Sequence, residues 1–312
     1  MADQARAGTI AGLTTPTGAE AVRGIFLILV AYLVITGADA SVKWALPEVG
    51  VAVSMIARGV VGSIAVLILT GGRGLGPVNR RLLATRGVLH CMVSATWYWA
   101  WLSGMALVDS YAIAAAAPLA MTLLAIPILG EKVGWRRWTS TFLGFAGVLV
   151  MLQPGGDLWR FETAVLLVSV MAMAVTRIWT RVLSATDGPA AIAFWLMVAH
   201  IPMGLLMLPF FPPPAVMPGG GVILALVFFG VANAIAHMLF ARAFALAPVS
   251  ALAPYEYSPL LLGGVLGFLI WAEIPAWTTI AGAVIVIIAG LYNLHRERVR
   301  RAQERRDAAV GR

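Results

Sequence analysis

Two short stretches decide the fold of this 312-residue chain: LGEKVGW at residues 129–135 and WAEIPAW at residues 271–277. In each stretch a glutamate stands four residues before a tryptophan, and a proline precedes that glutamate by 13 residues (Pro118) or 14 residues (Pro259). Apolar segments of helical length flank both stretches. This recurrence indicates an internal duplication, and a duplicated apolar chain is typical of secondary transporters, whose substrate site lies between the repeats.

The composition predicts an integral membrane protein. Hydrophobic residues make up 61% and charged residues 12% of the chain, whereas soluble domains carry about 25% charged residues. Mean hydropathy is +0.90, and apolar runs of about 20 residues match the ~30 Å hydrocarbon core of a bilayer. Because residues 1–22 contain no apolar signal-peptide core, the first span is expected to remain in the mature protein. Ten spans are predicted, at 24–45, 49–70, 87–108, 110–130, 138–153, 162–183, 190–211, 221–242, 248–271 and 275–294.

Lysine and arginine predict the orientation of these spans. If the N-terminus is cytoplasmic, 19 of the 22 basic residues fall in cytoplasmic segments, Lys43 and Arg160 fall outside, and Arg58 lies within the second span. This asymmetry indicates a multi-pass protein of a bacterial inner membrane, with cytoplasmic tails at residues 1–23 and 295–312. The same asymmetry accounts for the net charge of +8, so nucleic-acid binding is not predicted.

Sequence signatures of catalysis and of ATP hydrolysis are missing. The single cysteine, Cys91, rules out an intrachain disulfide and a cysteine-based metal cluster. The glycine-rich stretch at residues 71–76 lacks the Gly-Lys-Ser/Thr ending of a nucleotide-binding loop. No zinc-protease or serine-hydrolase motif occurs. No catalytic residue, metal site or cofactor is therefore predicted.

Two halves of five spans each must have opposite orientations in the membrane, because five is an odd number of crossings. The expected fold is all-α, with ten transmembrane helices arranged as two inverted five-helix repeats at residues 24–153 and 160–294. Glu131 and Glu273 mark equivalent points of the repeats. They are expected at helix starts, where a carboxylate satisfies free backbone amides and the helix dipole.

The residues around these points resemble a known family. The first group is residues 109–113, 117–118, 130–138 and 144–148, and the second is residues 245–248, 253–257, 273, 282 and 290–292. The two groups resemble the first and second EamA repeats of the drug/metabolite transporter superfamily. The chain is most similar to alphaproteobacterial-type carriers, which include riboflavin importers and S-adenosylmethionine carriers. The resemblance implies secondary transport but names no substrate, because other members export amino acids and metallophores.

Two charges are predicted deep in the membrane, and such residues are candidate functional residues by default. Arg58 lies about nine residues into the second span, and Glu256 lies about eight residues into the ninth, beside Tyr255 and between two prolines. One interpretation is an ion pair between Arg58 and Glu256. The other is a cavity in which Arg58 faces the substrate, while Glu256 is a substrate ligand or a proton carrier. Both interpretations are compatible.

Four further charges lie nearer the ends of spans. Asp39 and Lys43 are four residues apart on one helix face, so a local ion pair or an outer gate is expected. Arg177 and Arg181 occupy the matching places in the second half. Their predicted role is anchoring at the cytoplasmic surface, with gating as the alternative.

Aromatic residues of the third span supply a possible wall of the site. Ser94, Trp97, Trp101 and Met105 share a helix face, and the two tryptophans are too deep for an interfacial belt. They either pack against lipid or another helix, or form a stacking surface for a planar solute.

The eighth span presents a small and polar face, formed by Gly230, Asn233, Ala234, His237 and Ala241. Asn233 and His237 either join helices by hydrogen bonds or line a cavity. His90, His200 and His237 are too far apart in the sequence to predict a metal site.

The sequence therefore predicts an EamA-type secondary transporter of a small organic metabolite. Riboflavin or a similar planar metabolite is the first candidate, and an amino acid, S-adenosylmethionine or a related zwitterion is the second. A membrane-embedded enzyme or sensor is disfavoured. The expected partners are the solute and the lipid bilayer, with proton coupling as an alternative, and no oligomeric state follows. The predicted substrate-binding residues are Arg58, Trp97, Trp101, Asn233, His237, Tyr255 and Glu256, and the predicted gating or ion-pairing residues are Asp39, Lys43, Arg177 and Arg181.

Overall fold

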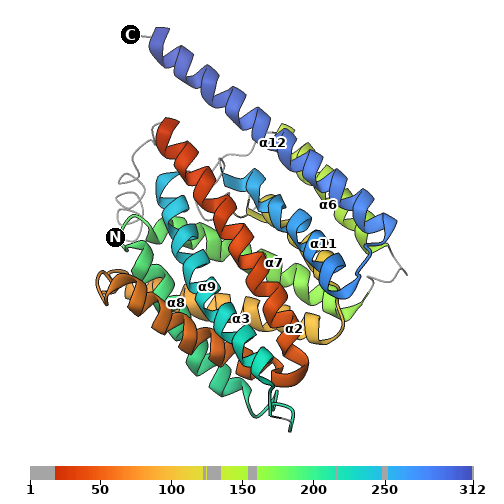
Figure 1. Cartoon of the computed structure of the whole chain (residues 1–312). Coiled ribbons are helices and arrows are strands. Elements are labelled where there is room, and N and C mark those ends of the chain that lie inside the picture. Colours follow the sequence, from red (N-terminus) through yellow and green to blue (C-terminus); the bar gives the residue numbers. More distant parts are fainter. Residues whose placement is uncertain are drawn as a thin grey trace.

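The computed structural model describes residues 18–121, 124, 135–153, 160–215, 217–247 and 252–310. Over these residues the chain is a bundle of helices (Figure 1). Glu131, which marks the first repeat, and most of the stretch around it lie outside the described residues.

Nine α-helices and one 3-10 helix have defined bounds in the described ranges, and residues 117–121 are helical as well. In chain order they are α2 (Gly18–Thr70), α3 (Arg80–Leu102), α4 (Leu107–Ala114), α6 (Trp135–Leu152), α7 (Phe161–Leu183), α8 (Pro189–Met207), α9 (Gly220–Leu246), η1 (Ala253–Tyr257), α11 (Ser258–Trp271) and α12 (Trp277–Val310). The predicted all-α fold is confirmed for this part of the chain.

Helix α2 contains two of the predicted spans. Its 53 residues would measure ~80 Å if straight, far more than one bilayer crossing. The helix bends sharply at Gly50, where φ is 71° (Figure 1). This φ lies in the left-handed region that favours glycine, and Pro47 further weakens the helical hydrogen bonding there. The boundary between the first two spans is therefore a kink within one element.

The prolines of the predicted ninth span break it. A 3-10 turn, η1, precedes the 14-residue helix α11, and Pro259 stands at the start of that helix. Proline fits the first turn of a helix because its missing N–H would have no partner there. Glu256 consequently lies on an irregular turn and not within a continuous helix.

The predicted number of ten spans is not confirmed. In the described residues four helices are long and apolar enough to cross a membrane: the Val22–Thr70 part of α2, α7, α8 and α9. The apolar segments Leu107–Met121, Phe142–Met151 and Trp277–Ala289 are shorter. Helix α12 continues to Val310, so the basic tail predicted at 295–312 is helical over most of its length and extends beyond the bundle (Figure 1).

Glycines allow helices from the two halves of the chain to pack closely. A Cβ on Gly282 of α12 would lie 2.5 Å from the carbonyl oxygen of Gly147 on α6. A Cβ on Gly230 of α9 would lie 2.7 Å from Val61 Cγ1 of α2. Small residues at such crossings let backbones approach each other, which is how helices associate in lipid. Helices α6 and α12 accordingly run side by side (Figure 1).

Candidate functional site

A cavity lies among α2, α3, α4, α7, α9, η1 and α11. Helix α3 contributes one continuous stripe to its wall. Arg86, His90, Ser94, Trp97 and Trp101 recur at helical spacing and all line the cavity. The cavity is therefore polar where α3 begins and aromatic where it ends.

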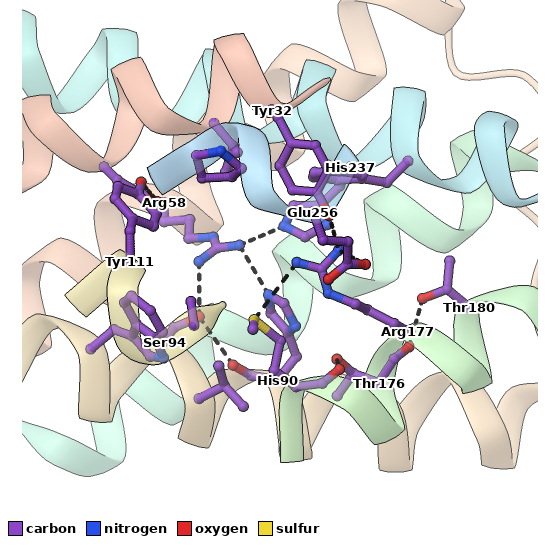
Figure 2. A pocket seen from close by; sticks show the side chains of 18 of the residues that line it. Tyr32, Arg58, His90, Ser94, Tyr111, Thr176, Arg177, Thr180, His237 and Glu256 are labelled. Atoms are coloured by element: carbon purple, nitrogen blue, oxygen red, sulfur yellow. Dashed lines mark hydrogen bonds and ion pairs between the residues drawn. The ribbon is translucent and has the colours of Figure 1, made fainter. Parts of the chain in front are cut away.

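Arg58 of α2 is buried at the centre of this site and is held by neutral groups. Its Nη1 donates to Ser94 Oγ and to Tyr98 Oη, each at 2.8 Å. Its Nη2 lies 2.8 Å from His237 Nε2 and 3.4 Å from His90 Nε2. Figure 2 shows both imidazoles directed at the guanidinium. Among the described residues, no carboxylate pairs with Arg58, so the predicted ion pair between Arg58 and Glu256 is wrong.

Three histidines that are distant in the sequence converge around Arg58. The ring centroids of His90 and His237 are 5.0 Å apart, and those of His90 and His200 are 6.1 Å apart. Because arginine has no acceptor, Nε2 of His237 must accept the hydrogen bond, and its proton is on Nδ1. The Arg58 guanidinium therefore occupies the position beside His237 Nε2 at which a metal ion would bind.

Glu256 pairs with Arg177 of α7. The distance from Glu256 Oε1 to Arg177 Nη1 is 2.9 Å, and Nη1 also donates to Tyr32 Oη at 2.5 Å. The charge contact is not an aligned hydrogen bond, because Oε1 has no hydrogen-bond donor among the described residues. Arg177 Nε is likewise without an acceptor there. The prediction that Arg177 anchors the cytoplasmic surface is wrong, because its side chain lines the cavity (Figure 2).

Asp39 and Lys43 do not pair with each other, so the predicted local ion pair is wrong, while the alternative of an outer gate stays a prediction. Asp39 lines the cavity and accepts a hydrogen bond from Tyr111 Oη at 2.7 Å. Lys43 instead forms an ion pair with Glu273 and lies over the ring of Trp271, 4.6 Å from its centroid. These two residues of α2 therefore belong to different sites.

Glu273 stabilises a different helix start from the one predicted. It lies in the turn between α11 and α12, and its Oε2 accepts the backbone N–H of Leu107 at 2.8 Å. Leu107 is the first residue of α4. The carboxylate therefore satisfies a free amide of α4, in the other half of the chain, as well as the charge of Lys43.

The tryptophans of α3 face the cavity, and their indole nitrogens differ. Trp101 donates from Nε1 to Ser110 Oγ at 2.9 Å. Trp97 Nε1 is buried and has no acceptor in the described part of the chain. The Trp97 ring lies 5.7 Å from the Trp101 ring and 6.2 Å from the Tyr111 ring. Trp97, Trp101 and Tyr111 thus form an aromatic corner, in which Trp97 Nε1 is an N–H donor without an acceptor among the described residues.

Besides Lys43, three predicted site residues lie outside the cavity. Asn233 donates from Nδ2 to the Phe229 carbonyl of its own helix. Tyr255 packs against the apolar cluster formed by α2 and α9. Arg181 donates to the carbonyl oxygen of Phe244. Their residue types suggested a polar lining, but each side chain points towards a neighbouring backbone or apolar surface.

Arg86 is a cavity residue that sequence reasoning missed. The positive-inside pattern assigned it to the cytoplasmic surface, yet its side chain is buried and lines the cavity. Its Nε donates to Thr180 Oγ1 at 2.7 Å and to the Thr176 carbonyl at 3.3 Å. The available signal was its spacing: Arg86, His90 and Ser94 recur every four residues on the face that continues to Trp97.

Residues 161–294 match the EamA-like transporter family. The chain carries an EamA family domain. This domain extends from α7 into α12 and supplies Arg177, His237 and Glu256 to the cavity, while α2, α3 and α4 supply the facing wall. The cavity thus lies between the EamA domain and the N-terminal half. Together with its apolar helices, the domain identifies a multi-pass membrane protein.

Curated relatives of the chain are transporters with different solutes. It is 27% identical to a riboflavin transporter of Vibrio cholerae, over 80% of this chain and 84% of the relative. It is 27% identical to an S-adenosylmethionine uptake transporter of Rickettsia prowazekii, over 59% of this chain and 60% of the relative. It is 25% identical to a pseudopaline exporter of Pseudomonas aeruginosa, over 85% and 94%.

The EamA domain and the helices before it match one crystal structure almost throughout. The TM-score is 0.63 at 16% identity, and the match covers 88% of this chain and 98% of the other. At this identity the similarity supports the fold alone.

Proposed function

We propose that this protein is a secondary transporter that moves a small planar metabolite by alternating access, with riboflavin as the first candidate. The observation that carries the proposal is the aromatic corner of Trp97, Trp101 and Tyr111 inside a cavity between two halves of the chain. Aromatic rings favour stacking with a planar solute. The names of the curated relatives support transport over catalysis.

The polar groups near the corner suit a heteroaromatic solute. Trp97 Nε1 is a donor without an acceptor among the described residues, and a ring carbonyl would satisfy it. His90 Nδ1 is buried and similarly unpartnered within the described ranges.

The alternating mechanism rests on two inverted repeats, residues 24–153 and 160–294. The pattern of helix packing supports this proposal. Helix α2 packs against α9, and α3 packs against α7. In the proposed repeats α7 is the equivalent of the first part of α2, and α9 is the equivalent of α3, so these two contacts are equivalent to each other. Helix α6 packs against α12, and α4 against α11, so each helix meets its proposed equivalent. Such symmetry provides two alternative closures around one central cavity.

The proposed location is a bacterial inner membrane with both termini in the cytoplasm. The support is the distribution of basic residues, 19 of 22 on one side. A reporter fused after Arg306 should read cytoplasmic, and one inserted within residues 212–220 should read periplasmic. If both reporters read the same side, the inverted arrangement is wrong.

A zwitterion such as an amino acid or S-adenosylmethionine is the second candidate. The observation that favours it is the presence in one cavity of a guanidinium without a carboxylate partner, Arg58, and a carboxylate oxygen without an aligned donor, Glu256 Oε1. Opposite charges of a solute would pair with these groups.

Uptake in defined bacterial strains tests the proposal. Riboflavin-auxotrophic cells that express the chain should grow on low external riboflavin and accumulate labelled riboflavin. Uptake of S-adenosylmethionine and of amino acids should be measured in parallel, with empty-vector cells as the control. Uptake of S-adenosylmethionine or of an amino acid, without uptake of riboflavin, would replace the first candidate with the second.

A further inference from the structure

The cavity wall contributed by α3 changes in character along its length. Arg86 lies near the start of the helix, His90 and Ser94 follow, and Trp97 and Trp101 lie near its end. Eleven residues separate Arg86 from Trp97, which corresponds to ~16 Å along a helix axis. A solute that contacts both residues must therefore be elongated and must carry different chemical groups at its two ends.

The Arg86 guanidinium is positioned but only partly used. Thr180 Oγ1 and the Thr176 carbonyl both accept from Nε, and these contacts fix the side chain against α7 (Figure 2 shows both threonines). The two Nη groups make no hydrogen bond to any described residue. Because arginine stays charged in proteins, four Nη protons of a buried cation remain free to bind oxygen atoms.

Neither carboxylate that lines the cavity lies against Arg58 or Arg86. Glu256 lies against Arg177 at 2.9 Å, and Asp39 accepts the hydroxyl proton of Tyr111 at 2.7 Å. Three guanidinium groups, Arg58, Arg86 and Arg177, thus face two carboxylates in one cavity. Arg58 and Arg86 have no carboxylate partner among the described residues, which leaves the cavity with an excess of positive charge.

We propose that Arg86 binds an anionic oxygen group of the solute, a carboxylate or a phosphate, while a planar ring at the other end of the solute lies against Trp97. The planar forked guanidinium suits either group, because both present two oxygens at the matching spacing. This inference rests on the proposed transport function and narrows its substrate class to elongated aromatic anions. A flavin that carries a 5′-phosphate fits this class better than riboflavin itself, which is uncharged.

A matched pair of probes tests the charge. Purified protein in detergent is titrated with riboflavin and with riboflavin 5′-phosphate, and binding is followed by quenching of flavin fluorescence. The phosphate should bind at least tenfold more tightly to the unaltered protein. Arg86→Gln should remove this difference, whereas Arg81→Gln, at an exposed position of the same helix, should preserve it. Equal Kd values for the two flavins in the unaltered protein would overturn the proposal for flavins.

A second pair of probes separates this inference from the flavin proposal. Benzoate and benzyl alcohol differ in charge but share one ring, and their effects on the melting temperature are measured with the same variants. If neither flavin binds, the flavin candidate fails, and the second pair alone decides the role of Arg86. Stabilisation by benzoate at concentrations at least tenfold below those of benzyl alcohol, lost in Arg86→Gln, supports the anion site. Equal responses refute it. Since both comparisons begin with the unaltered protein, a variant that fails to fold does not prevent the decision.

Discussion

Two ion pairs of this protein, Lys43–Glu273 and Arg177–Glu256, are built differently. In the first, one oxygen of Glu273 binds Lys43 and the other accepts the Leu107 amide, so both carboxylate oxygens have partners. In the second, Glu256 Oε1 lies 2.9 Å from Arg177 Nη1 without an aligned hydrogen bond, and Arg177 Nε has no acceptor among the described residues. The first pair lies outside the cavity and the second lines it.

This difference separates a structural contact from a site that can bind a solute. A partly buried carboxylate with both oxygens satisfied holds its neighbours in one arrangement, here α2, α4 and the turn after α11. Unsatisfied buried polar atoms are costly and persist where a ligand or another state uses them. We therefore expect the Lys43–Glu273 pair to govern stability and the Arg177–Glu256 pair to govern transport. Four predictions test this comparison.

The largest effect on stability should come from Glu273→Gln. The substitution leaves Lys43 without a carboxylate and weakens the acceptor for Leu107, so the free energy of unfolding should fall by about 3 kcal/mol, as for a broken buried ion pair. Thermal melting and denaturant titration in detergent measure the loss. Glu48→Gln is the control, because that carboxylate accepts the Gly219 amide at an exposed position and should cost less. Equal losses in both variants would contradict the structural role of the first pair.

Glu256→Gln should affect transport more than stability. If Glu256 carries a proton during the cycle, the variant should lose concentrative uptake at least tenfold while it still exchanges solute across the membrane. If the carboxylate only balances Arg177, the variant should melt earlier, and adding Arg177→Gln should restore part of the melting temperature by removing the unpaired cation. Arg58→Gln is the control addition and should restore nothing, because Arg58 is not the partner of Glu256. Normal accumulation together with normal melting would eliminate both roles.

A smaller effect is expected from Trp97→Phe, which keeps an aromatic ring in the cavity that the second pair also lines but removes the indole N–H that has no acceptor among the described residues. Solute affinity should fall about fivefold, the equivalent of one hydrogen bond of about 1 kcal/mol. Trp99→Phe is the matched control, because Trp99 packs against Phe161 outside the cavity. Half-saturation constants for uptake provide the measurement. Unchanged affinity in Trp97→Phe would mean that the aromatic corner serves packing only.

The smallest effect is expected at the predicted residues that lie outside the cavity. Asn233→Ala and Tyr255→Phe should change the half-saturation constant less than twofold, because neither side chain lines the cavity. Uptake by the two variants is compared with that of the unaltered chain at matched expression. A large loss of affinity in either variant would mean that the binding site extends beyond the cavity. The distinction between the two ion pairs, which rests on the cavity lining, would then fail.

Local sequence patterns predicted single helices well and their tertiary partners poorly. The spans predicted at 162–183 and 190–211 correspond to α7 (Phe161–Leu183) and α8 (Pro189–Met207), because each is a continuous apolar run bounded by polar or turn residues. The predicted pairs Arg58–Glu256 and Asp39–Lys43 were both wrong. Arg86 and Arg177 were assigned to the membrane surface, because distance from the end of a span estimates depth but not the direction of a side chain.

By itself the sequence determined the membrane class, the helical content and two of the buried charges, Arg58 and Glu256. These properties depend on residues that are close together in the chain: an apolar run, a helical spacing, a proline in the first turn. Only the tertiary structure decided which charge meets which. The packing of α2 against α9 places Arg58 beside His237, and the turn η1 places Glu256 beside Arg177. Such contacts join residues more than 70 positions apart, and they follow from how helices pack in three dimensions, which local spacing does not encode.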